Sequence, residues 1–302
     1  MRPAPIDIVV LMGGTSPERE VSLRSGAAIT DALVSLGHRP QAIDYTGNIF
    51  QYQDRFQSAD LVFLALHGGD GESGQVQAVL EEMGVRFTGT GPLGSALCMD
   101  KHLSKAVISR FGIPTPEWVY LTSPNAEEIP LDLPVVVKPN SLGSTIGLTV
   151  VEEKRHWKQA LDTAFAADSG VLVERFIPGR ELTVTILDSR ALPIVEIKPS
   201  HGLYDYDCKY TSGMSTYDCP ADLSKEQTRR IQKLAESMFH LCRGRHYARI
   251  DFRLDPEGNP WCLEMNTLPG MTATSLVPKA AAAAGMDFET LVQNMVDLAL
   301  HG

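Results

Sequence analysis

The chain has 302 residues, of which 43% are hydrophobic and 21% are charged, so it is long enough for two or three soluble globular domains. Its formal net charge of −10 argues against nucleic acid or an anionic membrane as a general partner, because both favour basic surfaces. No apolar run is long enough to span a membrane or form a signal core, and the five cysteines show no CxxC or zinc-type spacing, so we expect reduced thiols in the cytoplasm.

The N-terminal part alternates buried strands with helices. Strands are expected at 6–12, 60–66 and 85–89, and helices at 18–36 and 75–83. Ser16 is expected to cap the first helix, with Pro17 at its first position and Gly37 at its end. This rhythm predicts an α/β domain with a parallel sheet over residues 1–95. Sites in such sheets lie beyond the carboxyl ends of the strands, where GGTSPERE and HGGDGESG follow.

Two α+β units are expected next, as a central domain at 96–178 and a C-terminal domain at 179–302. The central pattern predicts helices at 93–110 and 152–166, and strands at 133–139, 148–151 and 170–177. The last pattern predicts strands at 181–188 and 191–198, a helix at 224–241, a hairpin and two closing helices. An irregular stretch at 199–220 interrupts this unit, and we expect it to be a mobile, functional loop.

The predicted hairpin sets polar side chains opposite one another. ARIDFRLD and PWCLEMN flank the four-residue turn PEGN. Folding the strands on that turn pairs Asp255 with Pro260, Asp251 with Glu264 and Arg249 with Asn266. Because strand side chains alternate between faces, the other face is expected to be apolar, formed by Ile250, Phe252, Leu254, Leu263 and Met265.

The polar face of the hairpin predicts a metal site. Asp251 and Glu264 would repel each other as facing carboxylates, and a divalent cation between them removes the repulsion. Oxygen ligands that include the amide of Asn266 suit Mg²⁺ or Mn²⁺ rather than zinc. The alternative is a solvated sheet face with chance acids, which fits poorly with two facing acids, an arginine and an amide on one face.

A magnesium site with few protein ligands suggests a bound nucleotide, although the sequence has neither a P-loop nor the kinase motifs. The phosphate-binding candidates are Lys101, Lys138, Lys209 and the loop NSLGSTIG, whose backbone N–H groups can cap phosphate oxygens. Glu174 and Glu181 can accept hydrogen bonds from an adenine amino group and a ribose. Alternatively, Lys138 is a solvated lysine at a sheet margin and the Gly/Ser loop is only a connection.

Nine blocks in order resemble a known family over about residues 6–298. They are GGTSPEREVSLRSG, ALHGGDGESG, MDK, VVVKPNSLGSTIG, VLVERFIPGRELTV, YDYDCKY, CPA, ARIDF and LEMNTLPGMTATSLVP. The chain resembles the D-alanine–D-alanine ligase family of the ATP-grasp superfamily. This resemblance implies a three-domain ATP-grasp fold and ATP-dependent joining of two D-alanines through an acyl phosphate. It also implies a cytoplasmic homodimer that serves peptidoglycan precursor synthesis.

The resemblance implies that ATP lies between the central and C-terminal domains. Lys101 and Lys138 would hold phosphates, and Lys209 would reach them from the 199–220 loop. Adenine and ribose would be held by Glu174, the backbone of Arg175 and Ile177, and Glu181. Two Mg²⁺ or Mn²⁺ ions would be bound by Asp251, Glu264 and Asn266.

For the amino-acid substrates, the resemblance implies a second set of residues. Glu18 would hold the ammonium of the first D-alanine with His67 close by. Arg249 and the N–H of Gly270 would stabilise an oxyanion. The second carboxylate would be held by Ser275 and the N–H of Leu276, and the mobile loop would be closed by Ser144 and Tyr210.

Plainer roles remain open for four of these residues. Glu18 can simply favour the first turn of its helix, and His67 can be a hydrogen-bonded histidine at a strand end. Ser144 can bond only its own loop, and Tyr210 can be loop packing. 

The function also has alternatives. One is an ATP-grasp ligase that joins D-alanine to D-lactate or D-serine, or uses other substrates, although Tyr210 favours the D-alanine dipeptide by resemblance. Another is a nucleotide-binding module without turnover. Arg249 argues against such a module, since a pure binder has no need of an oxyanion group.

Overall fold

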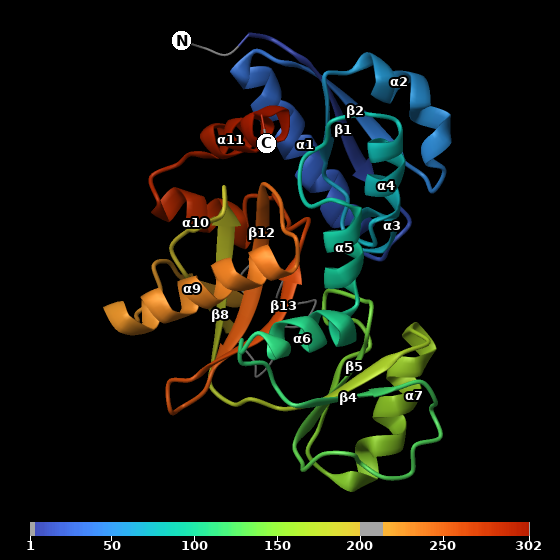
Figure 1. Ribbon diagram of the computed structural model, residues 1–302, viewed down its shortest axis with the longest axis vertical. Coiled ribbons are helices and arrows are strands. Elements are labelled where there is room, and N and C mark those ends of the chain that lie inside the picture. Colours follow the sequence, from blue (N-terminus) through green and yellow to red (C-terminus); the bar gives the residue numbers. More distant parts are fainter. Residues whose placement is uncertain (1–3, 200–213, 302) are drawn as a thin grey trace.

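The computed structural model describes residues 4–199 and 214–301 and arranges three sheets in chain order (Figure 1). The first sheet is parallel throughout, in the order β2-β1-β3. Its strands are β1 (Asp7–Gly13), β2 (Arg39–Tyr45) and β3 (Leu61–Leu64). The accompanying helices are α1 (Arg19–Leu36), α2 (Gln53–Ser58), α3 (Gly69–Glu72) and α4 (Gln75–Glu82), with a 3-10 turn η1 (Ile49–Tyr52). The predicted parallel α/β layer is therefore confirmed.

Two local predictions in this layer are wrong. The segment 85–89 is not a strand, because only a single bridge joins Val62 to Phe87. The third strand of the sheet is instead β2, which lies at the opposite edge, beside β1. Its sequence RPQAIDY contains no apolar run because β2 is an edge strand with one half-solvated face. Helix α1 begins at Arg19, two residues after Pro17, so Ser16 is not its N-cap.

Ser16 instead ties two loops together at the carboxyl ends of β1 and β3. Its hydroxyl donates to the His67 carbonyl at 2.5 Å and accepts from the Glu18 N–H at 3.2 Å. Gly37 ends α1 in the left-handed region at φ 91°, as predicted. The loops GGTSPERE and HGGDGESG thus lie side by side, which places Glu18 next to the strand ends.

The central sheet is antiparallel, in the order β4-β7-β5-β6. Its strands are β4 (Trp118–Leu121), β5 (Val135–Pro139), β6 (Thr149–Val151) and β7 (Val171–Arg175). Helix α7 (Trp157–Ala167), preceded by the 3-10 turn η2 (Lys154–His156), packs its apolar side on this sheet.

The single helix predicted at 93–110 is in fact two helices, α5 (Pro92–Met99) and α6 (Lys101–Arg110). The break falls at Asp100, whose carboxylate accepts from the Leu103 N–H at 2.9 Å and caps α6. Aspartate competes with helix continuation through such local bonds. The break makes Lys101 the first residue of α6.

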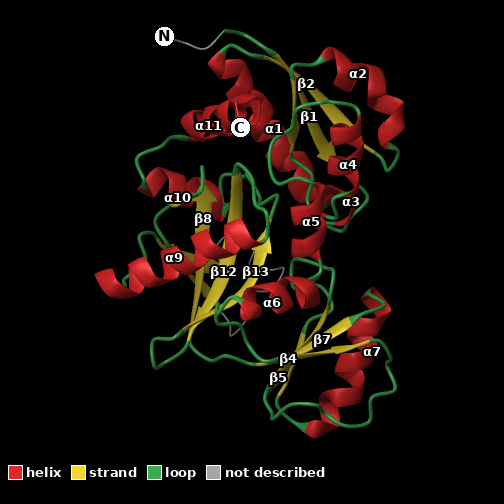
Figure 2. Ribbon diagram, viewed as in Figure 1, coloured by secondary structure: helices red, strands yellow, loops and turns green. Residues whose placement is uncertain are grey.

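The last sheet has the order β11-β10-β8-β12-β13, with β9 beside β8. Figure 2 labels three of its strands, β8, β12 and β13. The strands of this sheet are β8 (Arg180–Leu187), β9 (Arg190–Ala191), β10 (Val195–Pro199), β11 (Ser215–Asp218), β12 (Tyr247–Leu254) and β13 (Pro260–Asn266). The remaining helices within the described residues are α9 (Lys225–Leu241), α10 (Leu276–Ala283) and α11 (Phe288–His301). Helix α9 packs against this sheet, whereas α11 packs on α1 and β3.

The C-terminal helix therefore shares a hydrophobic core with the N-terminal sheet, and Leu291, Met295 and Val296 are buried in it. The three domain ranges 1–95, 96–178 and 179–302 remain a prediction. Each range contains one of the three sheets, but the core of the first sheet draws on both ends of the chain.

The register of the hairpin is confirmed where the polar residues lie. Arg249 pairs with Asn266 and Asp251 with Glu264. A β-bulge after Asp251 then shifts the register by one residue, so Leu254, not Asp255, faces Pro260.

The bulge also re-aims one side chain. Leu263 was expected on the apolar face with Met265, yet Cys262 and Met265 are buried in the core while Leu263 lines a pocket beside Glu264. The extra residue of the bulge interrupts the alternation of faces on which the prediction relied.

Several predicted features fall outside the described residues, namely Lys209, Tyr210 and most of the 199–220 loop. Cys208 lies there as well, and the four cysteines within the described residues are free thiols. Within the described part of the 199–220 stretch the prediction of irregular structure is wrong, because 215–218 form β11, which pairs with β10. None of the helices in the described part of the chain is long and apolar enough to cross a membrane.

Candidate active site

Two adjoining pockets hold every predicted site residue that lies in the described part of the chain. The larger pocket lies between the central and last sheets and is lined by Lys101, Lys138, Ser144, Glu174, Arg175, Ile177, Glu181, Arg249, Asp251, Glu264 and Leu276, among others. The smaller pocket lies under the loops that follow β1, β3 and β13 and is lined by Glu18, His67, Ser144, Arg249, Asn266, Gly270, Ser275 and Leu276, among others. Ser144, Arg249 and Leu276 line both pockets, so the two pockets share part of their lining and adjoin each other.

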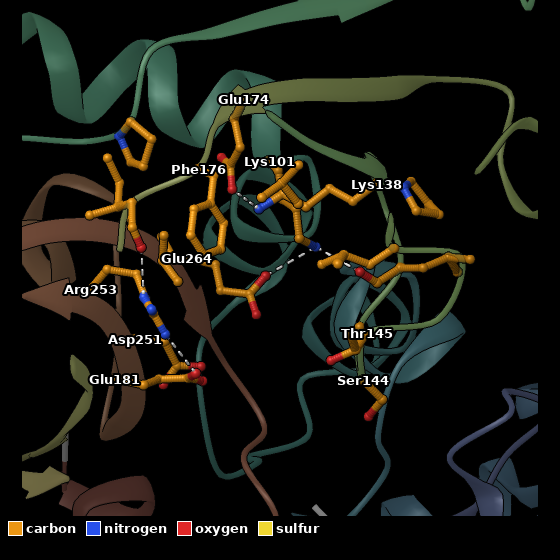
Figure 3. A pocket seen from close by; sticks show the side chains of 18 of the residues that line it. Lys101, Lys138, Ser144, Thr145, Glu174, Phe176, Glu181, Asp251, Arg253 and Glu264 are labelled. Atoms are coloured by element: carbon orange, nitrogen blue, oxygen red, sulfur yellow. Dashed lines mark hydrogen bonds and ion pairs between the residues drawn. The ribbon is translucent and has the colours of Figure 1, made fainter. Parts of the chain in front are cut away.

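Lys138 stands at the end of β5 and faces the larger pocket (Figure 3). Its Nζ donates to Glu174 Oε1 at 2.6 Å, and Lys105 Nζ lies 3.0 Å from Glu174 Oε2. Burial acts to raise the pKa of Glu174, but the charges of Lys105 and Lys138 outweigh it and hold the pKa below its usual range. Lys138 is only 8% exposed, so its interpretation as a solvated lysine at a sheet margin is wrong.

Lys101 bridges the two walls of the larger pocket (Figure 3). Its Nζ donates to the Leu142 carbonyl at 2.8 Å and lies 3.2 Å from Glu264 Oε2. Since α6 begins at Lys101, the break at Asp100 turns this side chain toward the hairpin. The same pocket thus contains two lysines from different elements, which suits a polyanionic ligand.

Asp251 accepts hydrogen bonds from three side chains. The Arg249 guanidinium donates to both of its oxygens, at 3.0 and 2.9 Å. Thr183 Oγ1 and Asn266 Nδ2 donate to it at 2.6 and 3.0 Å. The repulsion expected between Asp251 and Glu264 is therefore relieved by protein cations, Arg249 on one acid and Lys101 on the other.

The loop NSLGSTIG connects the two pockets. Ser144 and Thr145 both have left-handed backbone conformations, with φ of 53° and 64°, which non-glycine residues adopt rarely. The Ser144 hydroxyl donates to Glu18 Oε1. The alternative in which Ser144 bonds only within its own loop is wrong, and strained backbone of this kind is typical of functional sites.

His67 is held on both sides. Its Nδ1 lies 2.8 Å from the Leu268 carbonyl and its Nε2 lies 3.0 Å from Ser25 Oγ. Burial lowers the pKa of His67, although the charge of Glu18 opposes the shift, so a neutral ring is favoured near pH 7. These contacts fit a hydrogen-bonded histidine that joins the β3 loop to the segment after β13. Direct contact with a substrate stays a prediction.

Ser275 precedes α10 and lines the smaller pocket. Its Oγ accepts from the Thr272 N–H at 3.0 Å and lies 2.8 Å from Thr272 Oγ1. Leu276 is the first residue of the helix, so its N–H belongs to the unsatisfied first turn, where the helix dipole favours an anion.

Sequence reasoning missed Glu72, which lines the smaller pocket. Its carboxylate accepts from the Gly68 N–H at 2.8 Å and from the Leu268 N–H at 3.1 Å. Burial, helped by the charge of Glu18, raises the pKa of Glu72 to about 7. The position of Glu72 in HGGDGESG, beyond the end of a strand, could have indicated a site residue.

We expect Glu72→Gln to change how stability depends on pH. Because the folded pKa of Glu72 lies above its ordinary value of 4.5, the wild-type free energy of unfolding falls as the pH rises from about 4.5 to about 7. The substitution removes this titration, so the stability of the variant relative to wild type should rise over that range by roughly 1–3 kcal/mol. Denaturant unfolding at pH 5, 6, 7 and 8 measures it, and parallel pH profiles for the two proteins would contradict the assignment.

Arg253 and Lys105 were also missed. Arg253 donates to the Ile177 and Gly179 carbonyls at 3.1 and 2.9 Å and lies 3.3 Å from Glu181 Oε2. The alternation that placed Arg249 and Asp251 on one face also places Arg253 there. Lys105 follows Lys101 by four residues, so the two lie on the same side of α6.

Comparison with known proteins agrees with this geometry. A family model described as "D-ala D-ala ligase C-terminus" matches residues 107–297. The chain is 45% identical to the D-alanine--D-alanine ligase of Methylacidiphilum infernorum over 99% of this chain and 97% of that protein.

Solved structures show the same likeness. The D-alanine--D-alanine ligase of Bacillus anthracis superposes with a TM-score of 0.87 at 35% sequence identity. The structure of that ligase complexed with ATP superposes with a TM-score of 0.84 at 32% sequence identity. Both matches cover 98% of this chain and 97% of the solved chain. The VanG D-Ala:D-Ser ligase of Enterococcus faecalis matches with a TM-score of 0.84 at 29% identity, over 98% of this chain and all of that one.

Proposed function

Because this chain belongs to the D-alanine–D-alanine ligase family, we propose that it uses ATP to join two D-alanines into D-alanyl-D-alanine, with ADP and phosphate as the other products. The observation that carries the proposal is the pair of adjoining pockets, one lined by lysines and the other by Glu18 and the start of α10. A nucleotide in the first pocket would reach an amino acid in the second at Ser144 and Arg249, which line both.

ATP would occupy the larger pocket. Lys101 and Lys138 would hold its phosphates, and Lys209, outside the described residues, would add a third cation. Adenine would lie between apolar side chains such as Val136, Ile146 and Phe176. The polar contacts to adenine and ribose would come from Glu174, the backbone of Arg175 and Ile177, and Glu181.

The hairpin fits a divalent cation. Asp251 and Glu264 offer carboxylate oxygens from directly paired positions, and Asn266 adds an amide oxygen two residues further along the same strand, which is the ligand chemistry of Mg²⁺ or Mn²⁺. No group of three or more His, Cys, Asp or Glu forms a metal cluster within residues 4–199 and 214–301, so the ions would take their other ligands from nucleotide phosphate and water. When bound, Mg²⁺ would offset charge on the transferring phosphoryl group.

The two D-alanines would occupy the smaller pocket. Glu18 would pair with the ammonium of the first, and the oxygen of its carboxylate would attack the γ-phosphorus of ATP, which releases ADP and leaves an acyl phosphate. Ser275 and the Leu276 N–H would hold the carboxylate of the second D-alanine, whose amine then attacks the acyl carbon. The carbon–oxygen bond to phosphate breaks, and the amine loses a proton.

Arg249 and the Gly270 N–H would stabilise the oxyanion of that second step. Both line the smaller pocket, and such donors are most effective where water is excluded. Ser144 and Tyr210 would close the 199–220 loop over the site, which protects the acyl phosphate from hydrolysis.

The test is phosphate release from Mg·ATP with D-alanine, compared with L-alanine, D-serine, D-lactate and a magnesium-free sample. We expect release only with D-alanine and Mg²⁺, and a product with the mass of D-alanyl-D-alanine. Release only with another acceptor would overturn the substrate. ATP binding with no release in any sample would favour a nucleotide-binding module.

A D-alanine–D-serine ligase is the second candidate, favoured by the likeness to the Enterococcus faecalis enzyme. A fold match of this kind does not separate the two, since both matching enzyme types share the fold. A sample that contains both D-alanine and D-serine decides between them by product mass, because a D-alanine–D-serine ligase would form the mixed dipeptide. Within the proposed function, we also place the protein in the cytoplasm as a homodimer that serves peptidoglycan precursor synthesis.

A further inference from the structure

Lys105 is a fully buried lysine that the proposed reaction does not use. It is 0% exposed and is not among the described residues that line the larger pocket. Its Nζ donates to Thr115 Oγ1 at 2.5 Å, lies 3.0 Å from Glu174 Oε2 and stands 5.4 Å from the centre of the Trp118 ring. A buried charge held by three partners is costly to assemble, so we expect Lys105 to have a specific role.

Lys105 and Lys138 share one carboxylate, that of Glu174. Glu174, 3% exposed, has Lys138 at 2.6 Å on the pocket side and Lys105 at 3.0 Å on the sealed side. Two ammonium groups against one carboxylate leave an excess of positive charge next to the nucleotide pocket. Only Lys138 of the two lines that pocket, so only Lys138 can offer the excess charge to a ligand.

We propose that Lys105 is a positioning residue that pairs with Glu174 from behind and so releases Lys138 to bind an ATP phosphate. Without Lys105, Lys138 would be the only one of the two ammonium groups left to neutralise Glu174. Turning Lys138 toward a phosphate would then leave a buried carboxylate uncompensated, which is strongly unfavourable. With Lys105 present, Glu174 keeps one cation when Lys138 moves. This inference rests on the proposed ATP site.

The test measures nucleotide binding rather than turnover. Dissociation constants for ATP and for adenosine are measured by competition with a fluorescent nucleotide, for wild type, Lys105→Met, Glu174→Gln and the double variant. Lys105→Met should weaken ATP binding about tenfold or more and leave adenosine binding unchanged, because Lys138 acts on phosphate. Lys158→Met is the matched control, since Lys158 is an exposed lysine of α7 paired with Asp162, and it should bind both ligands like wild type.

The double variant makes the test independent of folding defects. In the Glu174→Gln variant, residue 174 carries no charge, so no second cation is needed there when Lys138 turns toward a phosphate. Lys105→Met should therefore cause no further loss of ATP affinity in the Glu174→Gln background. An equal loss in both backgrounds, an equal loss for adenosine, or a lower melting temperature with unchanged ATP affinity would each overturn the inference. A wild-type protein that does not bind ATP would instead overturn the proposed function.

Discussion

Arg249→Ala should lower kcat by about 10²–10³, the usual loss when one oxyanion donor is removed, while ATP binding stays close to wild type. Arg249 lines both pockets, so its guanidinium lies where the acyl carbon would meet the second amine. Its contact with Asp251 is not the only one on that acid, because Thr183 and Asn266 also donate to it. The hairpin face that would bind Mg·ATP therefore keeps two of its internal donors.

Steady-state rates and the ATP dissociation constant are the two measurements. Arg245→Ala is the matched control, since Arg245 is an exposed arginine paired with Glu81 outside both pockets, and its kinetics should equal those of wild type. A fall in kcat with no change in ATP affinity supports the oxyanion role. Unchanged kcat would remove Arg249 from the reaction, and a parallel loss of ATP affinity would reassign it to holding Asp251.

The part of the site that could be predicted from the sequence is the part fixed by local geometry. Asp251 and Glu264 face each other because a short turn sets their register, and alternation of faces then places Arg249 beside them. The prediction fails within the same hairpin at Leu263. One inserted residue moves the side chains beyond it to the opposite face of the strand. The residue types near the bulge do not indicate where that insertion occurs.

Contacts between distant segments were beyond such reasoning. Packing of the first sheet's core against Leu268 brings the β3 loop next to the segment after β13, so Glu72 accepts from the Leu268 N–H although 196 positions separate them. Lys105 pairs with Glu174 across the interface of α6 and β7. In both cases the residue type and its loop or helix position were visible, but its partner depends on tertiary packing. The family resemblance supplied roles for residues with motif positions and none for Lys105, whose role has to be inferred from its contacts.

Glu18→Gln should raise the KM for the first D-alanine by about 10²-fold, in line with the loss of one partner of a desolvated charge pair, with little change in ATP affinity. The Glu18 carboxylate faces the smaller pocket and accepts from the Ser144 hydroxyl. Glutamine keeps an acceptor for Ser144, so the NSLGSTIG loop should remain in place. What disappears is the negative charge that would balance the substrate ammonium.

Glu20→Gln separates this role from the plainer one. Glu20 is an exposed acid in the first turn of the same helix, where an acid interacts with the helix dipole. If Glu18 only favours that turn, both substitutions should lower the melting temperature by similar small amounts and neither should change KM. If Glu18 binds the ammonium, rates measured across D-alanine concentrations will show the higher KM in Glu18→Gln alone. The pocket position of Glu18 and its contact with Ser144 favour the second outcome, because a residue that served only the helix end would have no reason to face a loop from another sheet.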